Sequence, residues 1–231
     1  VYYGHSTMED FKNSFIGSNL AAPLFKKWIC HCYRQGDVVI TPTEYSRELL
    51  RNYGLYRKIY ALTNGVDTEF FHKTEQASGQ FRVLFHIPVD KKVVISAGHL
   101  IQRKGILDFL ETARRMPDVL FLWFGGGNHA LIPKEIKKAV AEKPENVIFA
   151  GFMPPVILRD AYCGADAFAF FSYEETEGIV VLEALSCEIP VIVRDIPVYE
   201  KWLEDGVQVR KATDPFSYEQ ALREILSGEQ E

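Results

Sequence analysis

From residue 93 onwards, short apolar runs alternate with stretches in which apolar residues recur at helical spacing. Continuous apolar runs predict strands buried on both faces, and the helices between them predict parallel pairing through right-handed crossovers. We therefore expect an α/β fold with a doubly wound sheet, whose ligand site lies beyond the carboxyl ends of the strands. The predicted strands are Val93–Ala97, Val119–Phe124, Val147–Ala150, Ala167–Phe171, Pro190–Val193 and, from a weaker pattern, Val207–Val209. The predicted helices are 105–116, 131–142, 155–163, 178–187, 197–204 and 217–227.

The first eighty residues have a different pattern and predict a separate unit. The polar stretch Lys73–Gln80 is the best candidate for a linker, so we divide the chain into residues 1–75 and 76–231. Thr43 is a suitable N-cap for a helix in the first unit. The elements predicted there are a strand end at 1–4, an amphipathic helix near 20–35, a strand at 38–40, a helix at 43–53 and a strand near 59–62.

The composition supports a globular protein and argues against several other classes. With 231 residues, of which 47% are hydrophobic, the chain can bury a sizeable core. The formal net charge of −5 argues against a general electrostatic grip on nucleic acid. No apolar run approaches the roughly 18–20 residues that a transmembrane helix requires. The chain starts at Val1 without an initiator Met or a signal-peptide pattern, so we expect a fragment of a longer protein.

The cysteines favour a reducing cytoplasm over a disulfide scaffold, because there are only four of them in a chain of this length. The triplet Cys30-His31-Cys32 lacks the usual zinc spacing, and neither Cys163 nor Cys187 belongs to a second pair. We therefore expect no metal site.

The candidate chemistry is concentrated in the segment Ser172–Ala184, at a predicted strand-to-helix junction. A helix beginning near Gly178 directs free N–H groups and the positive end of its dipole at a ligand, which suits a diphosphate. Glu175 and Glu183 lie on either side of that position, and carboxylates are strong acceptors for the sugar hydroxyl groups that flank the diphosphate of a nucleotide sugar. The alternative is that both glutamates are solvated residues at a helix end.

These residues resemble the Glu-x7-Glu motif of GT-B glycosyltransferases, specifically the retaining enzymes of glycosyltransferase family 4. The resemblance extends over nearly the whole chain, and its motifs are specific in their order and spacing rather than singly. It implies a GT-B fragment, with a Rossmann-like donor-binding domain at 76–231 after the last part of an N-terminal Rossmann-like domain at 1–75, which carries the acceptor and membrane contacts. The other matching segments are Thr41–Ser46, Leu62–Asp67 with Phe70 and Phe71, Gly98–Gly105 and Phe149–Phe152.

The resemblance assigns roles within the Glu-x7-Glu segment. It places Glu175 against the transferred sugar near the anomeric carbon, either as nucleophile or as an orienting group. It places Glu183 on the ribose, and the backbone amides of Gly178, Ile179 and Val180 on the sugar and diphosphate.

The resemblance also assigns roles to two loops. Arg103 and Lys104 supply cations for the departing diphosphate, a charge stabilisation that contributes strongly to such a step; their alternative is an ordinary solvated basic pair. Gly98 belongs to the same phosphate loop, and Gly151 and Phe152 belong to the loop beside the nucleobase.

Two histidines, His99 and His5, lie at positions where the family has residues that act on the donor. His99 stands where the family usually has an arginine, and because a histidine is neutral much of the time near pH 7, Arg103 is the candidate to replace the missing charge. His5 matches a histidine that the family places opposite the sugar across the cleft, so we count it with Glu175 as a candidate catalytic residue. A lone histidine is more often structural.

The stretch 13–28 mixes aromatic and aliphatic residues with adjacent lysines. Lys26, Lys27 and Trp28 suit a membrane interface, where apolar groups insert and cationic ends stay in water. The alternative is a core-facing helix with a solvated basic edge. Together with His5–Phe11, Ile179–Leu185 and Arg194–Glu200, the stretch resembles the bacterial diacylglycerol glucosyltransferase subgroup.

That resemblance implies transfer of glucose from UDP-glucose to diacylglycerol or monoglucosyldiacylglycerol. It implies a cytoplasmic enzyme held peripherally on the anionic inner face of the membrane, with no metal or other cofactor required. The hexose and the choice of lipid stay open. The alternatives are a family 4 enzyme with another acceptor, a UDP-sugar epimerase, or an inactive nucleotide-binding or membrane-docking fragment. The Glu-x7-Glu pair opposes the epimerase, and the intact candidate site opposes the inactive fragment.

Overall fold

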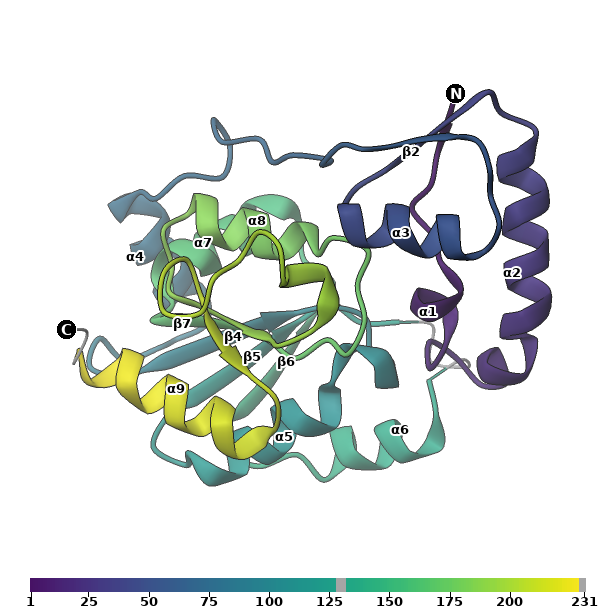
Figure 1. The fold of residues 1–231 in the computed structure, drawn as a ribbon. Helices are drawn as coiled ribbons and strands as arrows, with labels where there is room; N and C mark the ends of the chain where they lie inside the picture. Colours follow the sequence, from purple (N-terminus) through teal and green to yellow (C-terminus); the bar gives the residue numbers. More distant parts are fainter. Residues whose placement is uncertain (128–131, 229–231) are drawn as a thin grey trace.

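The computed structural model describes residues 1–127 and 132–228, which form two parallel sheets joined by one long connection (Figure 1). The first sheet has three strands in the order β1-β2-β3. Thr43 caps the helix after β2 through a capping box with Ser46, as the sequence predicts. The elements of this part are β1 (Tyr2–Tyr3), α1 (Met8–Phe11), α2 (Ser18–Arg34), β2 (Val38–Thr41), α3 (Glu44–Asn52) and β3 (Lys58–Ala61).

The second sheet has six strands in the order β6-β5-β4-β7-β8-β9, and every neighbouring pair is parallel. Its strands are β4 (Val93–Ala97), β5 (Leu120–Phe124), β6 (Val147–Gly151), β7 (Ala167–Phe170), β8 (Val191–Arg194) and β9 (Arg210–Ala212). Its helices are α4 (Glu75–Leu84), α5 (Ile106–Arg115), α6 (Lys134–Ala141), α7 (Pro155–Gly164), α8 (Ile179–Ser186) and α9 (Pro215–Ser227), with 3-10 turns η1 (Gln102–Lys104) and η2 (Pro197–Tyr199).

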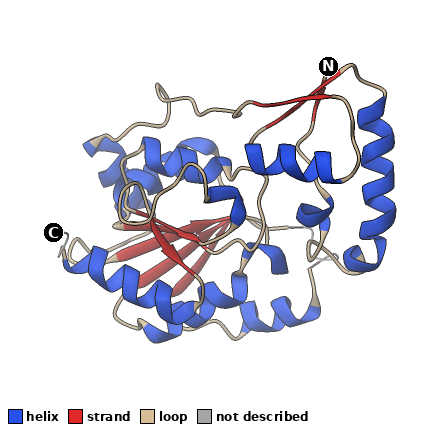
Figure 2. Ribbon diagram, viewed as in Figure 1, coloured by secondary structure: helices blue, strands red, loops and turns tan. Residues whose placement is uncertain are grey.

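Helices cover both faces of the six-stranded sheet, which confirms the doubly wound architecture. Figures 1 and 2 show α4, α7 and α8 on one face and α5, α6 and α9 on the other. The apolar strands lie between two separate clusters of buried side chains, one on each face. The strand order reverses between β4 and β7, so the loops after these two strands border the crevice in which a doubly wound sheet binds its ligand.

Two predicted elements of the second part are wrong. The last strand is β9 at Arg210–Ala212 and not Val207–Val209, because Gly206 (φ +78°) turns the chain and Val207 is exposed. In place of the helix predicted at 197–204, the structure has only the 3-10 turn η2. This short turn is enough to bury Val198 and Tyr199.

The polar stretch Lys73–Gln80 is not an irregular linker, because α4 begins at Glu75. The Thr74 side chain caps this helix, and Ala77 and Phe81 are buried. The connection without helix or strand runs instead over 62–74.

Candidate functional site

The loop after β7 carries Glu175, whose side chain is largely buried, with 6% of the residue exposed. The Ser172 hydroxyl donates to Glu175 Oε1 at 2.6 Å, and the Lys104 ammonium donates to the same oxygen. The Arg103 guanidinium lies 3.6 Å from it. Both basic residues belong to η1, which follows β4, whereas Glu175 follows β7. Because β4 and β7 are neighbours in the sheet, their loops meet although the residues are about 70 positions apart in the chain. The structure thus brings Glu175, Lys104 and Arg103 together.

Gly178 is the N-cap of α8 and has the left-handed conformation (φ +84°), and no side chain caps this helix. The first N–H groups of a helix have no partner within it, so they are available to a ligand. Gly178 is half-buried and Ile179 is 45% exposed, so the start of α8 lies at the surface of the protein. A side chain at Gly178 does not fit, because its Cβ would lie 2.4 Å from the Tyr199 hydroxyl.

Glu183 lies further along α8 and is partly buried. It accepts a hydrogen bond of 3.1 Å from the hydroxyl of Tyr162, a buried residue of α7. Burial raises the pKa of the Glu183 carboxyl, and the hydrogen bond from Tyr162 opposes that rise. The helix therefore carries an acceptor of fixed orientation on the far side of Gly178 from Glu175.

Arg103 is buried and joins the two parts of the chain. Its Nη1 donates to the Glu174 carbonyl at 2.6 Å and lies 2.9 Å from Asp10 of α1, while its Nε donates to Ser14 Oγ at 3.2 Å. Burial raises the pKa of Asp10, and the Arg103 charge opposes that rise. Arg103 is thus already engaged by a carboxylate, whereas its predicted role toward a diphosphate stays a prediction.

The first part of the chain also contacts the Glu175 loop directly. The Tyr45 hydroxyl donates to Glu174 at 2.8 Å, and the Thr43 hydroxyl donates to the Thr176 carbonyl at 2.8 Å. Burial raises the pKa of Glu174 to about 7, with the hydrogen bond from Tyr45 opposing and the nearby Glu9 adding to the rise. The sequence did not indicate these contacts, because no local pattern marks which residues meet across the two parts.

Two glycines of the predicted donor loops lie at strand ends. The Gly98 amide donates to the Phe124 carbonyl at 2.9 Å, and the Gly98 carbonyl accepts from Trp123 Nε1 at 3.0 Å. Gly151 ends β6 with φ +74°, and the side chain of Phe152 after it is 87% exposed. An exposed aromatic face at this edge suits stacking on a base.

The two histidines lie in different parts of the chain. Nδ1 of His99 lies 3.1 Å from the Gly126 carbonyl, which fixes this ring to the neighbouring loop. His5 follows β1, is exposed, and stacks on Tyr3 with ring centroids 6.2 Å apart. Its predicted role opposite the sugar stays a prediction.

Helix α2 lies at an outer edge of the molecule (Figure 1). Leu20, Leu24 and Trp28 recur every four residues and are 89%, 69% and 61% exposed. Lys27 is exposed beside them, whereas the Lys26 ammonium lies 4.4 Å from the centre of the Tyr53 ring. The opposite face of the helix packs inward through Ala22, Ile29, Cys30 and Tyr33.

No helix of residues 1–127 and 132–228 is both long and apolar enough to cross a membrane. Within the same residues, no group of three or more His, Cys, Asp or Glu side chains could hold a metal ion.

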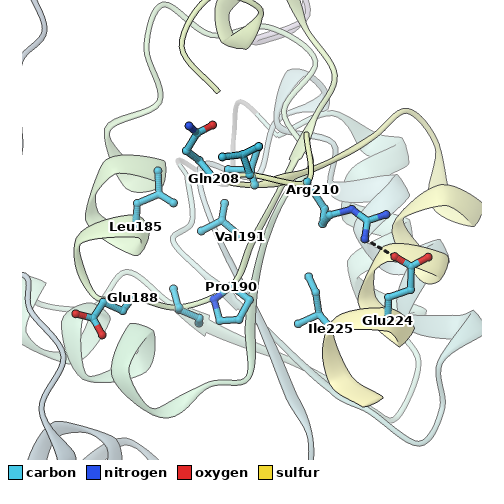
Figure 3. A pocket seen from close by; sticks show the side chains of 12 residues that line it. Leu185, Glu188, Pro190, Val191, Gln208, Arg210, Glu224 and Ile225 are labelled. Atoms are coloured by element: carbon cyan, nitrogen blue, oxygen red, sulfur yellow. Dashed lines mark hydrogen bonds and ion pairs between the residues drawn. The ribbon is translucent and has the colours of Figure 1, made fainter. Parts of the chain in front are cut away.

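A cavity of about 460 Å³ lies away from the Glu175 site (Figure 3). It is lined by Leu185, Pro190, Val191, Arg210 and Ile225, and the Arg210–Glu224 ion pair lies on one side of it. Val191 begins β8, with Pro190 directly before it, and Arg210 begins β9, so this cavity lies at the amino ends of these strands. It is therefore separate from the Glu175 site at the carboxyl ends.

Two family models match the chain. The model described as "Glycosyl transferases group 1" matches residues 80–231, and the model described as "Glycosyltransferase Family 4" matches residues 1–70.

The chain is also similar to known glycosyltransferases. The chain is 39% identical to a processive diacylglycerol alpha-glucosyltransferase of Acholeplasma laidlawii, over all of the chain and 70% of that protein. It is 29% identical to an alpha-galactosylglucosyldiacylglycerol synthase of Streptococcus pneumoniae, over 84% of the chain and 54% of that protein. The structure of Anabaena HepE with UDP and glucose superposes with a TM-score of 0.80 at 17% identity, covering 89% of the chain and 58% of HepE. At that identity the likeness shows the fold alone.

Proposed function

The chain belongs to the glycosyltransferases of group 1 and family 4, and from this we propose that it is the donor-binding part of a retaining hexosyltransferase that moves glucose from UDP-glucose to a membrane lipid. Its fold is that of GT-B glycosyltransferases. The observation that carries the proposal is the position of Glu175, which Ser172 and Lys104 hold in the loop directly before the amide end of α8.

The donor is proposed to lie along α8. The helix N-terminus at Gly178 and the Lys104 ammonium stabilise the negative charge of the diphosphate, where preorganised dipoles and cations are most effective. Glu183 accepts from the ribose hydroxyl groups on one side, and Glu175 faces the sugar on the other. During transfer, the bond from the anomeric carbon to the diphosphate oxygen breaks and a bond to the acceptor hydroxyl oxygen forms. The hydroxyl proton leaves with the diphosphate or a nearby base.

The acceptor is proposed to be diacylglycerol or monoglucosyldiacylglycerol at the cytoplasmic face of the membrane. Both relatives named above are glycolipid enzymes by their names, and α2 offers an apolar outer face with Lys27 beside it. Apolar side chains inserted into the interface, with a cation near anionic headgroups, are the features that hold a peripheral protein on a membrane. The proposed mechanism assigns no step to a metal, since Lys104 and the amides carry the diphosphate charge.

Supplying labelled UDP-glucose to the full-length protein tests this proposal. With vesicles containing diacylglycerol or monoglucosyldiacylglycerol, we expect the label to enter the lipid with the α configuration. Without acceptor, we expect the donor sugar to stay unchanged apart from slow hydrolysis. Conversion of the donor to another UDP-sugar without acceptor indicates an epimerase, and transfer to neither lipid rejects the proposed acceptor.

Replacing Leu20, Leu24 and Trp28 together by glutamine is expected to weaken binding to anionic vesicles at least about 100-fold, because burying one such side chain is worth roughly 1.5–3 kcal/mol. Glutamine adds no charge and keeps helix propensity. The measurement is co-sedimentation with vesicles over a range of lipid concentrations.

The matched control replaces Val83, Val89 and Val207, which are also exposed but lie on the six-stranded part, by glutamine. The control is expected to bind vesicles as the wild type does. Equal binding by the α2 variant and the wild type would show that this face does not meet the membrane.

A further inference from the structure

Glu177 is a buried carboxylate that lies directly before Gly178, with only 3% of the residue exposed. Its partners all come from the start of the connection between the two sheets. The Thr63 hydroxyl donates to Oε1, the Asn64 side-chain amide donates to Oε2 at 2.5 Å, and the Asn64 backbone N–H lies 3.3 Å from both oxygens. The carboxylate is thus satisfied by neutral donors of the other part of the chain.

These donors belong to exposed residues, so they are not fixed by a surrounding core. Beside them, a groove of about 610 Å³ separates the two parts and is lined by Thr43, Glu177 and Trp202. Thr63 and Glu177 both line this groove, so their contact lies at its border. A buried carboxylate that loses its donors pays a desolvation cost, so its position favours the arrangement in which the connection lies against α8.

The position of Glu177 in the chain gives this contact a consequence for the donor site. Gly178 follows it directly and is the N-cap of α8, in a left-handed conformation. If Thr63 and Asn64 move away from α8, one of two things follows. Either the Glu177 carboxylate loses its hydrogen-bond donors, or the Glu177–Gly178 peptide moves with them. The second outcome turns the amide end of α8, because φ of Gly178 sets the direction of the first N–H groups.

We infer that Glu177 is a positioning residue that couples the binding site of the leaving diphosphate to the contact of Thr63 and Asn64 with the start of α8. This inference rests on the proposed function, because it takes the amide end of α8 as that binding site. Coupling is reciprocal: if the contact with Thr63 and Asn64 favours the binding site, a diphosphate bound there must favour the contact. Ligand binding therefore reports on the connection even without transfer.

The test is amide hydrogen exchange of residues 63–65 in the full-length protein, with and without saturating UDP. UDP is expected to slow this exchange at least about 5-fold in the wild type, a coupling of roughly 1 kcal/mol. In the Glu177→Ala variant, UDP is expected to leave the exchange unchanged. In the same variant, kcat is expected to fall about 10- to 100-fold, because the amide end of α8 loses its fixed direction toward the leaving diphosphate.

A variant of another contact between the two parts provides the control. Glu48→Gln removes the exposed ion pair with Lys201, which joins the two parts at 2.7 Å, and is expected to keep the UDP effect on exchange and a kcat within about 2-fold of wild type. If Glu177→Ala does not fold, Glu177→Gln is measured instead, with a smaller loss expected.

UDP binding to the wild type without an effect at 63–65 overturns the inference and leaves the proposed function standing. An effect that persists in the Glu177 variant also overturns it. Coupling in a protein that transfers no sugar to lipid leaves the inference standing and rejects the proposed acceptor. A wild type that does not bind UDP overturns both.

Discussion

Replacing Glu175 by alanine in the full-length protein is expected to lower kcat for glucosyl transfer about 100- to 1,000-fold, with UDP still bound. The expected size is that of removing one preorganised group beside the developing charge. UDP affinity is expected to hold or to rise, because the change frees the Lys104 ammonium from its carboxylate partner and leaves it to the diphosphate. The measurements are initial rates with vesicles and calorimetric titration with UDP.

The matched variant is Glu175→Gln, which keeps the shape of the side chain and an oxygen that accepts from Ser172. If the carboxylate charge stabilises the positive charge that develops at the anomeric carbon, the glutamine variant is also expected to lose most activity. Near-normal transfer by either variant removes Glu175 from the mechanism. If the variant loses UDP binding as well as activity, Glu175 acts in binding the donor and not in the transfer step.

Gly178→Ala is expected to weaken UDP binding about 10- to 100-fold, since losing one hydrogen bond to a charged group costs roughly 1.5–3 kcal/mol. The φ of +84° is unfavourable for alanine by about 1–2 kcal/mol, and the new Cβ would lie 2.4 Å from the Tyr199 hydroxyl. Relief of both conflicts requires the first turn of α8 to shift, which moves the amides away from the diphosphate. Calorimetric titration of the chain with UDP measures the effect.

Gly206→Ala is the control for backbone strain, because Gly206 has φ +78° but a Cβ there would meet nothing within 4 Å. It is expected to lose stability without losing UDP affinity. The double variant Gly178→Ala with Tyr199→Phe removes the contact with the hydroxyl, and it is expected to recover part of the affinity. Unchanged UDP binding by Gly178→Ala would place the diphosphate elsewhere.

The sequence predicted best where buried apolar residues dominate the pattern. Strand β4 was predicted to the residue, because all five of its side chains are buried. Strand β9 was misplaced, because Arg210 and Lys211 pair with Glu224 and Asp195 at the sheet edge and give no apolar run. The start of α4 resembles a linker in the sequence, because Ala77 is the only apolar residue in the stretch 73–80 and Phe81 follows it.

Part of the candidate site could be predicted from the sequence and part could not. The spacing of Glu175, Gly178 and Glu183 along one junction was visible in the sequence, and the strand order adds Lys104 to them. The Asp10 contact with Arg103 and the Asn64 contact with Glu177 are not visible in the sequence, because they depend on how the two sheets and their loops pack against each other. No periodicity within either part encodes that packing.

The central claim is that a diphosphate binds at the amide end of α8, and a crystal structure of the chain with UDP tests it most directly. The predicted result has phosphate oxygens within hydrogen-bond distance of the Gly178–Val180 amides and the Lys104 ammonium, with the ribose on Glu183. UDP bound at the amino ends of β8 and β9, or α8 amides left without phosphate contact in a UDP-bound crystal, would contradict the account.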